Sequence, residues 1–296
     1  MGHVLVDDSV FHVFFDKDAA PVARACSGDL ATFVCRDCYD GEIAHDYFDF
    51  KKINMKNNNP ASGPLYVEGA EPGDVLKVEI LSIDLADHGC MSARPGVGVY
   101  EIDAPVCRTF SIHDGCGDID GVLIPLKPMI GVIGTAPAGE PESTQTPGEH
   151  GGNLDIRNMN AGNTLYLPVN VPGALLSMGD LHGVQGDGET VICALEAPGR
   201  VTVRLTVLKG RSVPTPFLVS PTHYMTTAAD ASLDVCSVQA ARKMHRFLME
   251  HGHLDAAKAG MLLSLQGNLR ISQVVNPKKG CIMEFPKGLI PIDFEE

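Results

Sequence analysis

Short segments in which apolar and polar residues alternate constrain the fold of this 296-residue chain more than any other feature. In RVTVRLTVL, the apolar residues Val201, Val203, Leu205 and Val207 recur at every second position. Because side chains of a strand point alternately to opposite faces, this period is typical of a half-buried β-strand. Similar segments, among them VLKVEIL, TLYLPVNV and ETVICALEA, are separated by turn sequences such as EPGD and APGR. The pattern predicts a mainly β, sandwich-like fold.

Helical periodicity appears mainly late in the chain. One helix is predicted from about Ser232 to His251, and a second from the N-cap candidate Asp255 to Leu265, with Gly267 placed to end it. Both are expected to cover a sheet rather than form a separate domain, and LRISQVVNP then returns to a strand pattern. The apolar face predicted for the first helix consists of Val238, Ala241, Met244, Phe247 and Leu248.

The domain organisation follows from these patterns. Glycine and proline are spread through the sequence rather than gathered in a linker. We therefore predict one domain over residues 1–296, with a β-rich region at 1–225 and small helical additions within 226–296.

The sequence also contains two segments that are similar to each other. LYVEGAEPGDVL begins at Leu65 and LYLPVNVPGALL begins at Leu165, and both contain Leu-Tyr, Pro-Gly and a final leucine at constant offset. Either the match is chance, or the chain contains two related strand–turn–strand units. The first continues as the alternating strand KVEILSIDL, whereas the second continues as SMGDLHGVQGDGE.

Composition limits the partners of the protein. A net charge of -14 argues against a nucleic-acid partner, and no apolar segment approaches the length of a membrane span. The first residues carry no basic segment typical of a signal peptide, and the nine cysteines are odd in number and irregular in spacing. We therefore expect a cytoplasmic protein with reduced thiols, and we interpret the close pair Cys35 and Cys38 as buried apolar thiols.

The segment MGDLHGVQGDGE, residues 178–189, is the first candidate site. If the preceding strand continues, Asp180 and His182 leave the same face, and a hairpin would bring Asp187 and Glu189 close to them. Such carboxylates repel one another unless a cation neutralises them, and one imidazole with carboxylates suits zinc or a similar ion. A solvated acidic hairpin is the alternative interpretation.

A second candidate site lies in the polar loop GTAPAGEPESTQTPGEHGGNLD, residues 134–155, because long loops in compact domains are often functional. The loop ends in three groups able to bind a metal or a substrate, His150, Asn153 and Asp155. It also supplies two acid–base candidates, Glu140 and Glu149, for which plain solvation is the alternative. Its adjacent glycines, Gly151 and Gly152, would let the backbone approach a substrate. A weaker candidate is Asp37 in CRDCYDG, as a ligand or a turn residue.

At these residues the sequence resembles the acetamidase/formamidase family. The resemblance implies a β-rich fold with small helical additions, hydrolysis of short aliphatic amides to a carboxylate and ammonia, a soluble homo-oligomer, and a divalent metal in the acidic-histidine region. The motifs that carry it are NPASGPLYVEGAEPGDVL (59–76), MIGVIGTAPAGE (129–140), TPGEHGGNLD (146–155), GDLHGVQGDGE (179–189) and RISQVVNP (270–277).

A mechanism follows from the resemblance and the chemistry together. A cation polarises an amide carbonyl and activates water, and we expect zinc, with calcium as a second possibility. A glutamate must move the water's proton to the leaving nitrogen, with Glu140 the first choice and Glu189 the second. The predicted ligands are His182, Asp180, Asp155, Asn153 and Asp37, and the predicted substrate-binding residues are His150, Gly151 and Gly152, whose backbone N–H groups would steady the oxyanion.

Two other interpretations remain open. A cysteine nucleophile would need a cysteine in a glycine-rich turn beside Glu and Lys partners, and the sequence offers none. A non-catalytic β-sandwich module that binds calcium through acidic loops is the alternative function. The central His182 speaks against it, because calcium prefers six to eight oxygen ligands.

Overall fold

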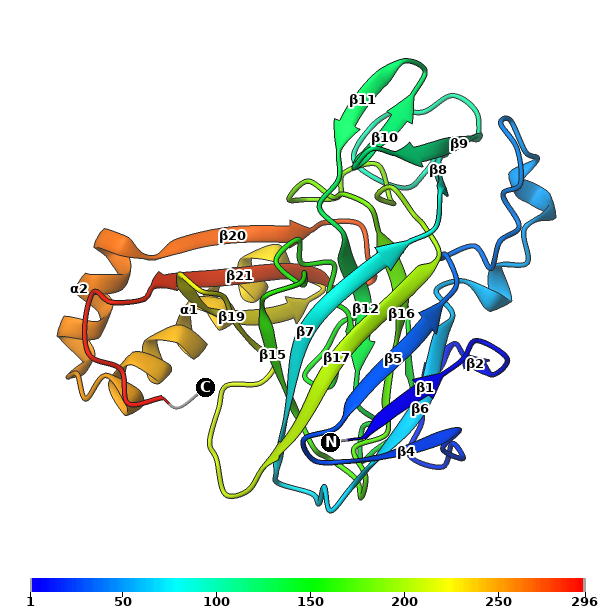
Figure 1. Ribbon diagram of the computed structural model, residues 1–296. Coiled ribbons are helices and arrows are strands. Elements are labelled where there is room, and N and C mark those ends of the chain that lie inside the picture. The colour runs from blue at the N-terminus through cyan, green and yellow to red at the C-terminus, as the bar shows by residue number, and fades with distance from the viewer. Residues whose placement is uncertain (1, 295–296) are drawn as a thin grey trace.

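The structure, a computed structural model that describes residues 2–294, is mainly β and contains two large sheets joined by a common core (Figure 1). The larger sheet has nine strands, and its edge strand β1 is parallel to β5, whereas the other neighbouring pairs are antiparallel. Its order is β1 (His3–Val6), β5 (Leu30–Cys35), β17 (Gly199–Leu208), β7 (Val75–Leu85), β15 (Thr164–Pro168), β18 (Phe217–Val219), β19 (His223–Asp230), β21 (Lys279–Pro286) and β20 (Asn268–Gln273).

The second sheet has six strands and carries the candidate site. Its central strand β16 is buried over its whole length, whereas strand β7 of the larger sheet has partly exposed residues. The order is β14 (Gly151–Asn153), β12 (Met129–Gly134), β16 (Leu176–His182), β6 (Ala61–Glu68) and β2 (Phe11–His12), with β4 (Ala23–Cys26) also paired to β6.

The core lies between the two sheets and confirms the predicted alternation. Val201, Val203 and Leu205 of β17 are fully buried there with Met178 of β16, and Val207 packs at the margin. Burying one such side chain contributes about 1.5–3 kcal/mol, so this layer is the main source of stability around the site.

Two helices cover the outer strands of the larger sheet, as the sequence predicts (Figure 1). Helix α1 (Leu233–His251) begins at the N-cap Ser232, and α2 (Ala256–Gln266) runs from the N-cap Asp255 to Gly267. The predicted apolar face of α1 is wrong at Val238, which is 45% exposed, because the buried face is rotated toward other positions. The buried residues of α1 are Cys236, Ala240, Met244, Phe247 and Leu248.

The predicted division into two regions at residue 225 stays a prediction. The C-terminal strands β20 and β21 belong to the same sheet as β1.

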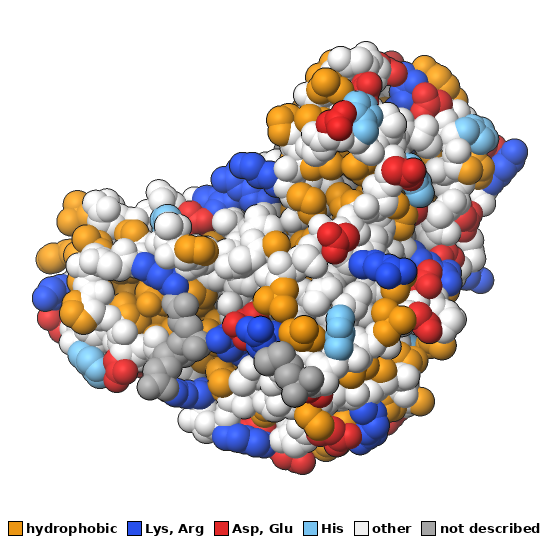
Figure 2. All heavy atoms as spheres, viewed as in Figure 1, with side chains coloured by type: hydrophobic (Ala, Val, Ile, Leu, Met, Phe, Trp, Pro, Cys, Tyr) orange, Lys and Arg blue, Asp and Glu red, His pale blue; other side chains and the backbone are white. Residues whose placement is uncertain are grey.

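A separate four-stranded sheet forms a lobe beside the sandwich, and a notch separates this lobe from the helical end of the molecule (Figures 1 and 2). No helix within residues 2–294 combines the length and apolar character needed to cross a membrane. The remaining elements are β8 (His88–Ala93), β9 (Val106–His113), β10 (Cys116–Ile119) and β11 (Val122–Pro125) of the lobe, the pair β3 (Phe14–Phe15) and β13 (Glu142–Ser143), and the 3-10 turns Phe50–Lys52 and Met55–Asn57.

The two similar segments that begin at Leu65 and Leu165 form two paired strand–turn–strand units. The first unit, β6–β7, crosses from the six-stranded sheet to the nine-stranded sheet, and the second, β15–β16, crosses in the opposite direction. Strand β16 pairs with β6, and β15 pairs with β7. The turns also bond to each other, since Gly73 N–H donates to Val169 O (2.9 Å) and Gly173 N–H donates to Ala70 O (2.8 Å). This arrangement places the C-terminal end of the second unit inside the sandwich.

Candidate functional site

Strand β16 carries Asp180 and His182 into the protein interior. The two side chains are 2% and 1% exposed, and His182 Nε2 lies 3.4 Å from Asp180 Oδ1. Asp180 has a positive φ of 55°, a conformation that costs an L-residue roughly 1–2 kcal/mol. Asp155 and Glu189 share this left-handed backbone, with φ of 45° and 46°. Strain of this kind gathers at functional sites, where the surrounding structure maintains it.

Three further carboxylates converge on this histidine from separate segments. His182 Nε2 is 3.3 Å from Glu196 Oε2 and 3.9 Å from Asp155 Oδ1. Glu189, 8% exposed, completes a group with Asp155 and His182 whose possible ligand atoms lie within 4.8 Å of one another. The sequence therefore brings Asp155, Asp180, His182 and Glu189 into one buried cluster, to which the structure adds Glu196.

The side chain of Gln185 determines which nitrogen of His182 faces the carboxylates. Gln185 Nε2 donates to the backbone carbonyls of Asp155 (2.8 Å) and Ser272 (3.4 Å), so its Oε1 must be the atom that meets His182 Nδ1 at 2.8 Å. His182 Nδ1–H therefore donates to Gln185, and Nε2 is directed at the acidic groups. Metal-binding histidines are commonly oriented in this way, with the second nitrogen donating to a neighbouring group.

Each of three carboxylates has one satisfied oxygen and one oxygen without a partner. Asp155 Oδ1, Asp180 Oδ1 and Glu196 Oε2 are buried and make no hydrogen bond to any residue that the structure describes. These three atoms are the same ones that lie 3.3–3.9 Å from His182 Nε2. The donors to the satisfied oxygens are Asn276 for Asp155 (2.6 Å), Asn59 for Asp180 (2.7 Å) and the Ala194 N–H for Glu196 (2.9 Å).

The electrostatics of the cluster demand positive charge. Burial raises the pKa of Asp155 to about 6 and that of Glu196 to about 8, and it raises the pKa of Glu189 well above its usual value. Burial alone would lower the pKa of His182, but the charges of Glu196 and Asp180 raise it well above its usual value. Without a cation, the cluster must therefore bind protons to relieve the repulsion.

The residues fit a divalent cation. The buried oxygens of Asp155, Asp180 and Glu196 make no hydrogen bond within the described part of the chain, and the oriented His182 nitrogen completes a mixed nitrogen–oxygen donor set. This chemistry suits zinc better than calcium, which prefers oxygen alone. Gly131 of β12 leaves the necessary space, because a Cβ atom there would lie 2.7 Å from Asp155 Oδ1.

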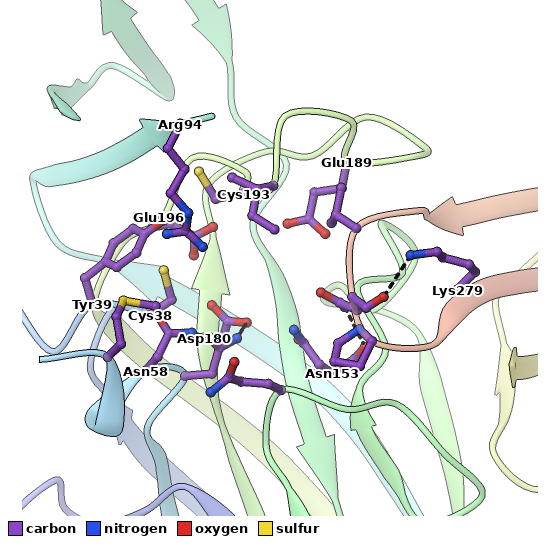
Figure 3. A pocket seen from close by; sticks show the side chains of 17 residues that line it. Cys38, Tyr39, Asn58, Arg94, Asn153, Asp180, Glu189, Cys193, Glu196 and Lys279 are labelled. Atoms are coloured by element: carbon purple, nitrogen blue, oxygen red, sulfur yellow. Dashed lines mark hydrogen bonds between the residues drawn. The ribbon is translucent and has the colours of Figure 1, made fainter. Parts of the chain in front are cut away.

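A pocket of about 420 Å³ opens above this cluster (Figure 3). Figure 3 shows Asp180 and Glu196 on one side, with Glu189 and Asn153 across from them. Three members of the acidic cluster, Asp180, Glu189 and Glu196, line the pocket, and its remaining wall contains many polar side chains. The lining residues include Tyr39, Asn58, Arg94, Gln145, Cys193 and Lys279.

The predicted site residues separate into two groups in the structure. Asn153 lines the pocket, and its side-chain oxygen has no hydrogen-bond partner among residues 2–294. Asp37 instead closes a turn, since its Oδ1 accepts from the N–H groups of Tyr39 (2.8 Å) and Gly41 (3.2 Å). Glu140 is exposed at the surface, outside the residues that line the pocket.

The glycine loop packs beside the site rather than along the pocket wall. Gly151 N–H donates to Gly148 O (3.2 Å), and a Cβ on Gly151 or Gly152 would lie 2.2–2.3 Å from a backbone oxygen. His150 is 6% exposed and packs its ring against Phe15, with centroids 5.1 Å apart. These residues shape the β12–β14 pairing, and none of them lines the pocket.

Two other acidic residues of these segments form ion pairs elsewhere. Glu149 pairs with Lys243 of α1 at 2.8 Å, and Asp187 pairs with Arg270 of β20 at 2.8 Å. The expected approach of Asp187 to the cluster therefore does not occur, because the arginine holds it away. Of the two acids Asp187 and Glu189, only Glu189 is buried.

Sequence reasoning missed Glu196, Gln185, Asn59 and Asn276. Glu196 lies in ALEAPG, whose sequence indicates a strand end and a turn, and an isolated backbone bridge places it beside His182. Asn59 and Asn276 lie at Asn-Pro steps within NPASGPLY and RISQVVNP. The Asn-Pro dipeptide, which begins one of the family-like motifs and ends the other, was the sequence signal that could have identified these two asparagines.

The fold and this cluster define a β-sandwich protein with a buried histidine–carboxylate site beneath a polar pocket. The sequence profile described as the acetamidase/formamidase family matches residues 3–144 and 138–289. The chain belongs to the acetamidase/formamidase family.

Solved structures of related proteins agree in fold over nearly the whole chain. A crystal structure of an acetamidase from Bacillus halodurans is 44% identical with a TM-score of 0.94, and the match covers 95% of this chain and 97% of that one. A predicted acetamidase/formamidase from Thermoanaerobacter tengcongensis is 34% identical, with a TM-score of 0.93 and 96% of each chain covered.

A putative formamidase of Schizosaccharomyces pombe is 31% identical over 246 residues, or 62% of this chain and 60% of that protein. The matches to the curated relatives span only 60–66% of their lengths.

Proposed function

We propose that the protein hydrolyses short aliphatic amides, of the formamide and acetamide class, to a carboxylate and ammonia with the help of a divalent metal ion. The observation that carries the proposal is the set of three carboxylate oxygens around His182 Nε2 that make no hydrogen bond to a described residue, beneath a pocket lined by Asp180 and Glu196. The names of the related acetamidases and formamidases support the choice of substrate.

The residues that would hold the ion are His182, Asp155, Asp180 and Glu196, with Asn153 at the margin. When bound, a divalent ion supplies a Lewis acid that polarises the amide carbonyl and lowers the pKa of water. Zinc is the proposed ion, because one imidazole stands among the carboxylates. Gln185 keeps the imidazole oriented, and Asn59 and Asn276 orient Asp180 and Asp155.

Glu189 is the proposed acid–base residue. It lines the pocket, and its buried Oε2 has no partner within residues 2–294. It would take a proton from the attacking water and deliver one to the leaving nitrogen, since an amide anion does not leave. Glu140 is exposed and outside the pocket lining, so the proposal gives it no part in the chemistry.

The cysteines that line the pocket support a metal-assisted reaction over a cysteine nucleophile. Burial and the nearby Glu196 raise the pKa of Cys193 to about 12 and the pKa of Cys38 well above its usual value. At neutral pH both remain thiols, which are weak nucleophiles. A calcium-binding module without catalysis is disfavoured by the oriented imidazole at the centre of the donor set.

The substitution His182→Ala tests the proposal. We expect the variant to lose its metal in elemental analysis and its ammonia release from formamide and acetamide, while unfolding stays cooperative. His88→Ala is the matched control, because His88 lies on the lobe and its side chain is 66% exposed. Full hydrolysis by a metal-stripped wild-type preparation would refute the metal-assisted mechanism.

We also infer a cytoplasmic homo-oligomer. The support for a reducing compartment is that all nine cysteines are free thiols. Oligomerisation follows from the family resemblance alone, and light scattering after size-exclusion chromatography measures it directly.

A further inference from the structure

Arg94 is a cation in the pocket wall without an anionic partner among residues 2–294. It follows strand β8, and Figure 3 shows its side chain extending into the pocket beside Tyr39 and Glu196. Its Nη1 atom is buried and makes no hydrogen bond to any residue within 2–294. No carboxylate in that range forms an ion pair with it either, although the protein has 37 acidic residues and only 23 basic ones.

The guanidinium group of Arg94 packs with its flat face on an aromatic ring. Arg94 Cζ lies 4.3 Å from the ring centroid of Phe50, and the Phe50 and Tyr39 rings form an edge-to-face pair with centroids 6.1 Å apart. The Tyr39 hydroxyl is in turn hydrogen-bonded to Ser92 Oγ at 2.7 Å. A cation–π contact uses the face of the guanidinium and leaves its N–H edge free to donate. The stack therefore presents a positioned donor edge to the pocket.

An oriented guanidinium without a partner favours a carboxylate on the ligand. Burying an unbonded charged donor is costly, and a bidentate arginine–carboxylate pair removes that cost. Lys279, on another part of the pocket wall, adds a second cation, which donates to the backbone oxygen of Asn276 at 3.1 Å. The pocket wall thus carries two cations in addition to the acidic residues.

The size of the pocket points in the same direction. Its volume of about 420 Å³ lies within the range of sites that bind ligands much larger than acetamide. An amide group at the acidic cluster therefore leaves room for a second functional group near Arg94.

We propose that the preferred substrates are monoamides of small dicarboxylic acids, whose free carboxylate binds Arg94 while the amide lies at the acidic cluster. This inference rests on the proposed amide hydrolysis. In the reaction the amide C–N bond breaks and a C–O bond to the water oxygen forms. The nitrogen takes a proton and leaves as ammonia, and the product is a dicarboxylate.

The experiment compares isosteric pairs that differ in one charge. Ammonia release is measured for malonamate, succinamate and glutaramate, each against its own diamide, which offers two amides but no carboxylate. We expect kcat/KM for at least one monoamide to exceed that of its diamide about tenfold or more. Arg94→Met should reduce this ratio at least tenfold, mainly through KM, and Arg94→Lys should retain part of it.

Arg108→Met is the matched control. Arg108 also stacks on an aromatic ring, Tyr47 at 4.3 Å, but it pairs with Asp46 and lies outside the pocket lining. This variant should keep the wild-type ratio. A ratio of one or less in all three pairs, or a preference that survives Arg94→Met, would overturn the proposal.

A binding measurement separates this proposal from the proposed hydrolysis. Calorimetry with succinate, which needs no turnover, should detect binding to the wild-type protein and a loss of at least tenfold in affinity for Arg94→Met. Equal affinity of both proteins, or no binding to either, counts against the carboxylate site. Absence of ammonia release from every amide, formamide and acetamide included, counts against the hydrolase instead.

Discussion

The two strand–turn–strand units of the sandwich share a backbone plan but not a function. Both contain Leu-Tyr and Pro-Gly at the same offset, and both cross between the two sheets. In the first unit, β7 alternates buried and partly exposed residues. The buried acid of this unit, Asp74, lies just before β7 and pairs with Lys209 at 2.5 Å. In the second, all seven residues of β16 are buried, and two of them are Asp180 and His182.

The difference lies in what the second strand of each unit meets. Strand β7 lies between β17 and β15 and retains a solvent-facing side, so its polar residues stay hydrated. Strand β16 lies between β12 and β6 at the centre of its sheet, so polar residues there need partners. The carboxylates brought to His182 from other segments leave a charge that only protons or a cation can balance. One supersecondary plan thus serves as scaffold in the first copy and as support for a site in the second.

The largest effect should come from removing the proposed acid–base group of the second unit. Glu189→Gln keeps the shape of the side chain but cannot accept a proton, so we expect kcat for acetamide to fall about 10²–10⁴-fold. Metal content, measured by elemental analysis, should fall much less than activity, because His182 and three carboxylates remain. Glu140→Gln is the control, and it should leave kcat unchanged because Glu140 is exposed. The opposite result, loss in Glu140→Gln alone, would move the chemistry to the other loop.

The next effect compares the same turn position in the two units. Gly73 and Gly173 both have positive φ, 94° and 78°, but a Cβ on Gly73 meets nothing within 4 Å. A Cβ on Gly173 would lie 2.2 Å from the ring of Tyr66. We expect Gly73→Ala to lower the free energy of unfolding by about 1 kcal/mol from backbone strain, and Gly173→Ala by about 3 kcal/mol, because overpacking adds to the strain. Urea denaturation measures both, and equal losses would show that the two turns are packed alike.

The sequence predicted the local features of this comparison well. The period of two in β17, the start of the first helix near Ser232 and the N-cap Asp255 depend on neighbouring residues, and each is confirmed. The buried face of α1 was misplaced at Val238, because several periodic faces fit the same helix and packing on the sheet selects one. Residues two apart on one strand, Asp180 and His182, were likewise within reach of a local argument.

The long-range parts of the site were beyond that reach. Glu196 lies in ETVICALEA, which its pattern assigned to a strand but which forms no regular strand in the structure, and its bridge to His182 depends on pairing between segments. Glu140 and Asp155 lie in the same polar loop, yet only Asp155 reaches the cluster. The intervening strand β13 pairs with β3 and so anchors the first part of the loop at the surface. A sequence does not reveal which end of such a loop turns inward.

The effect that is smallest for each step in conditions, taken per pH unit, concerns the loop that covers the second unit, in which an ionisable group is buried outside the pocket. Burial, with a contribution from Lys278, lowers the pKa of His150 to about 4. In the unfolded chain its pKa is about 6.5, so between pH 6.5 and 4 the unfolded state binds a proton that the folded state does not. The free energy of unfolding should therefore fall by about 1.4 kcal/mol for each pH unit below 6.5, until the folded pKa is reached. His150→Gln removes this dependence, and subtracting the two urea-denaturation curves, both measured in EDTA, cancels the titrating carboxylates that the proteins share. Parallel curves from pH 7 to pH 4.5 would mean that His150 is hydrated, and that buried ionisable groups are confined to the pocket side of the second unit.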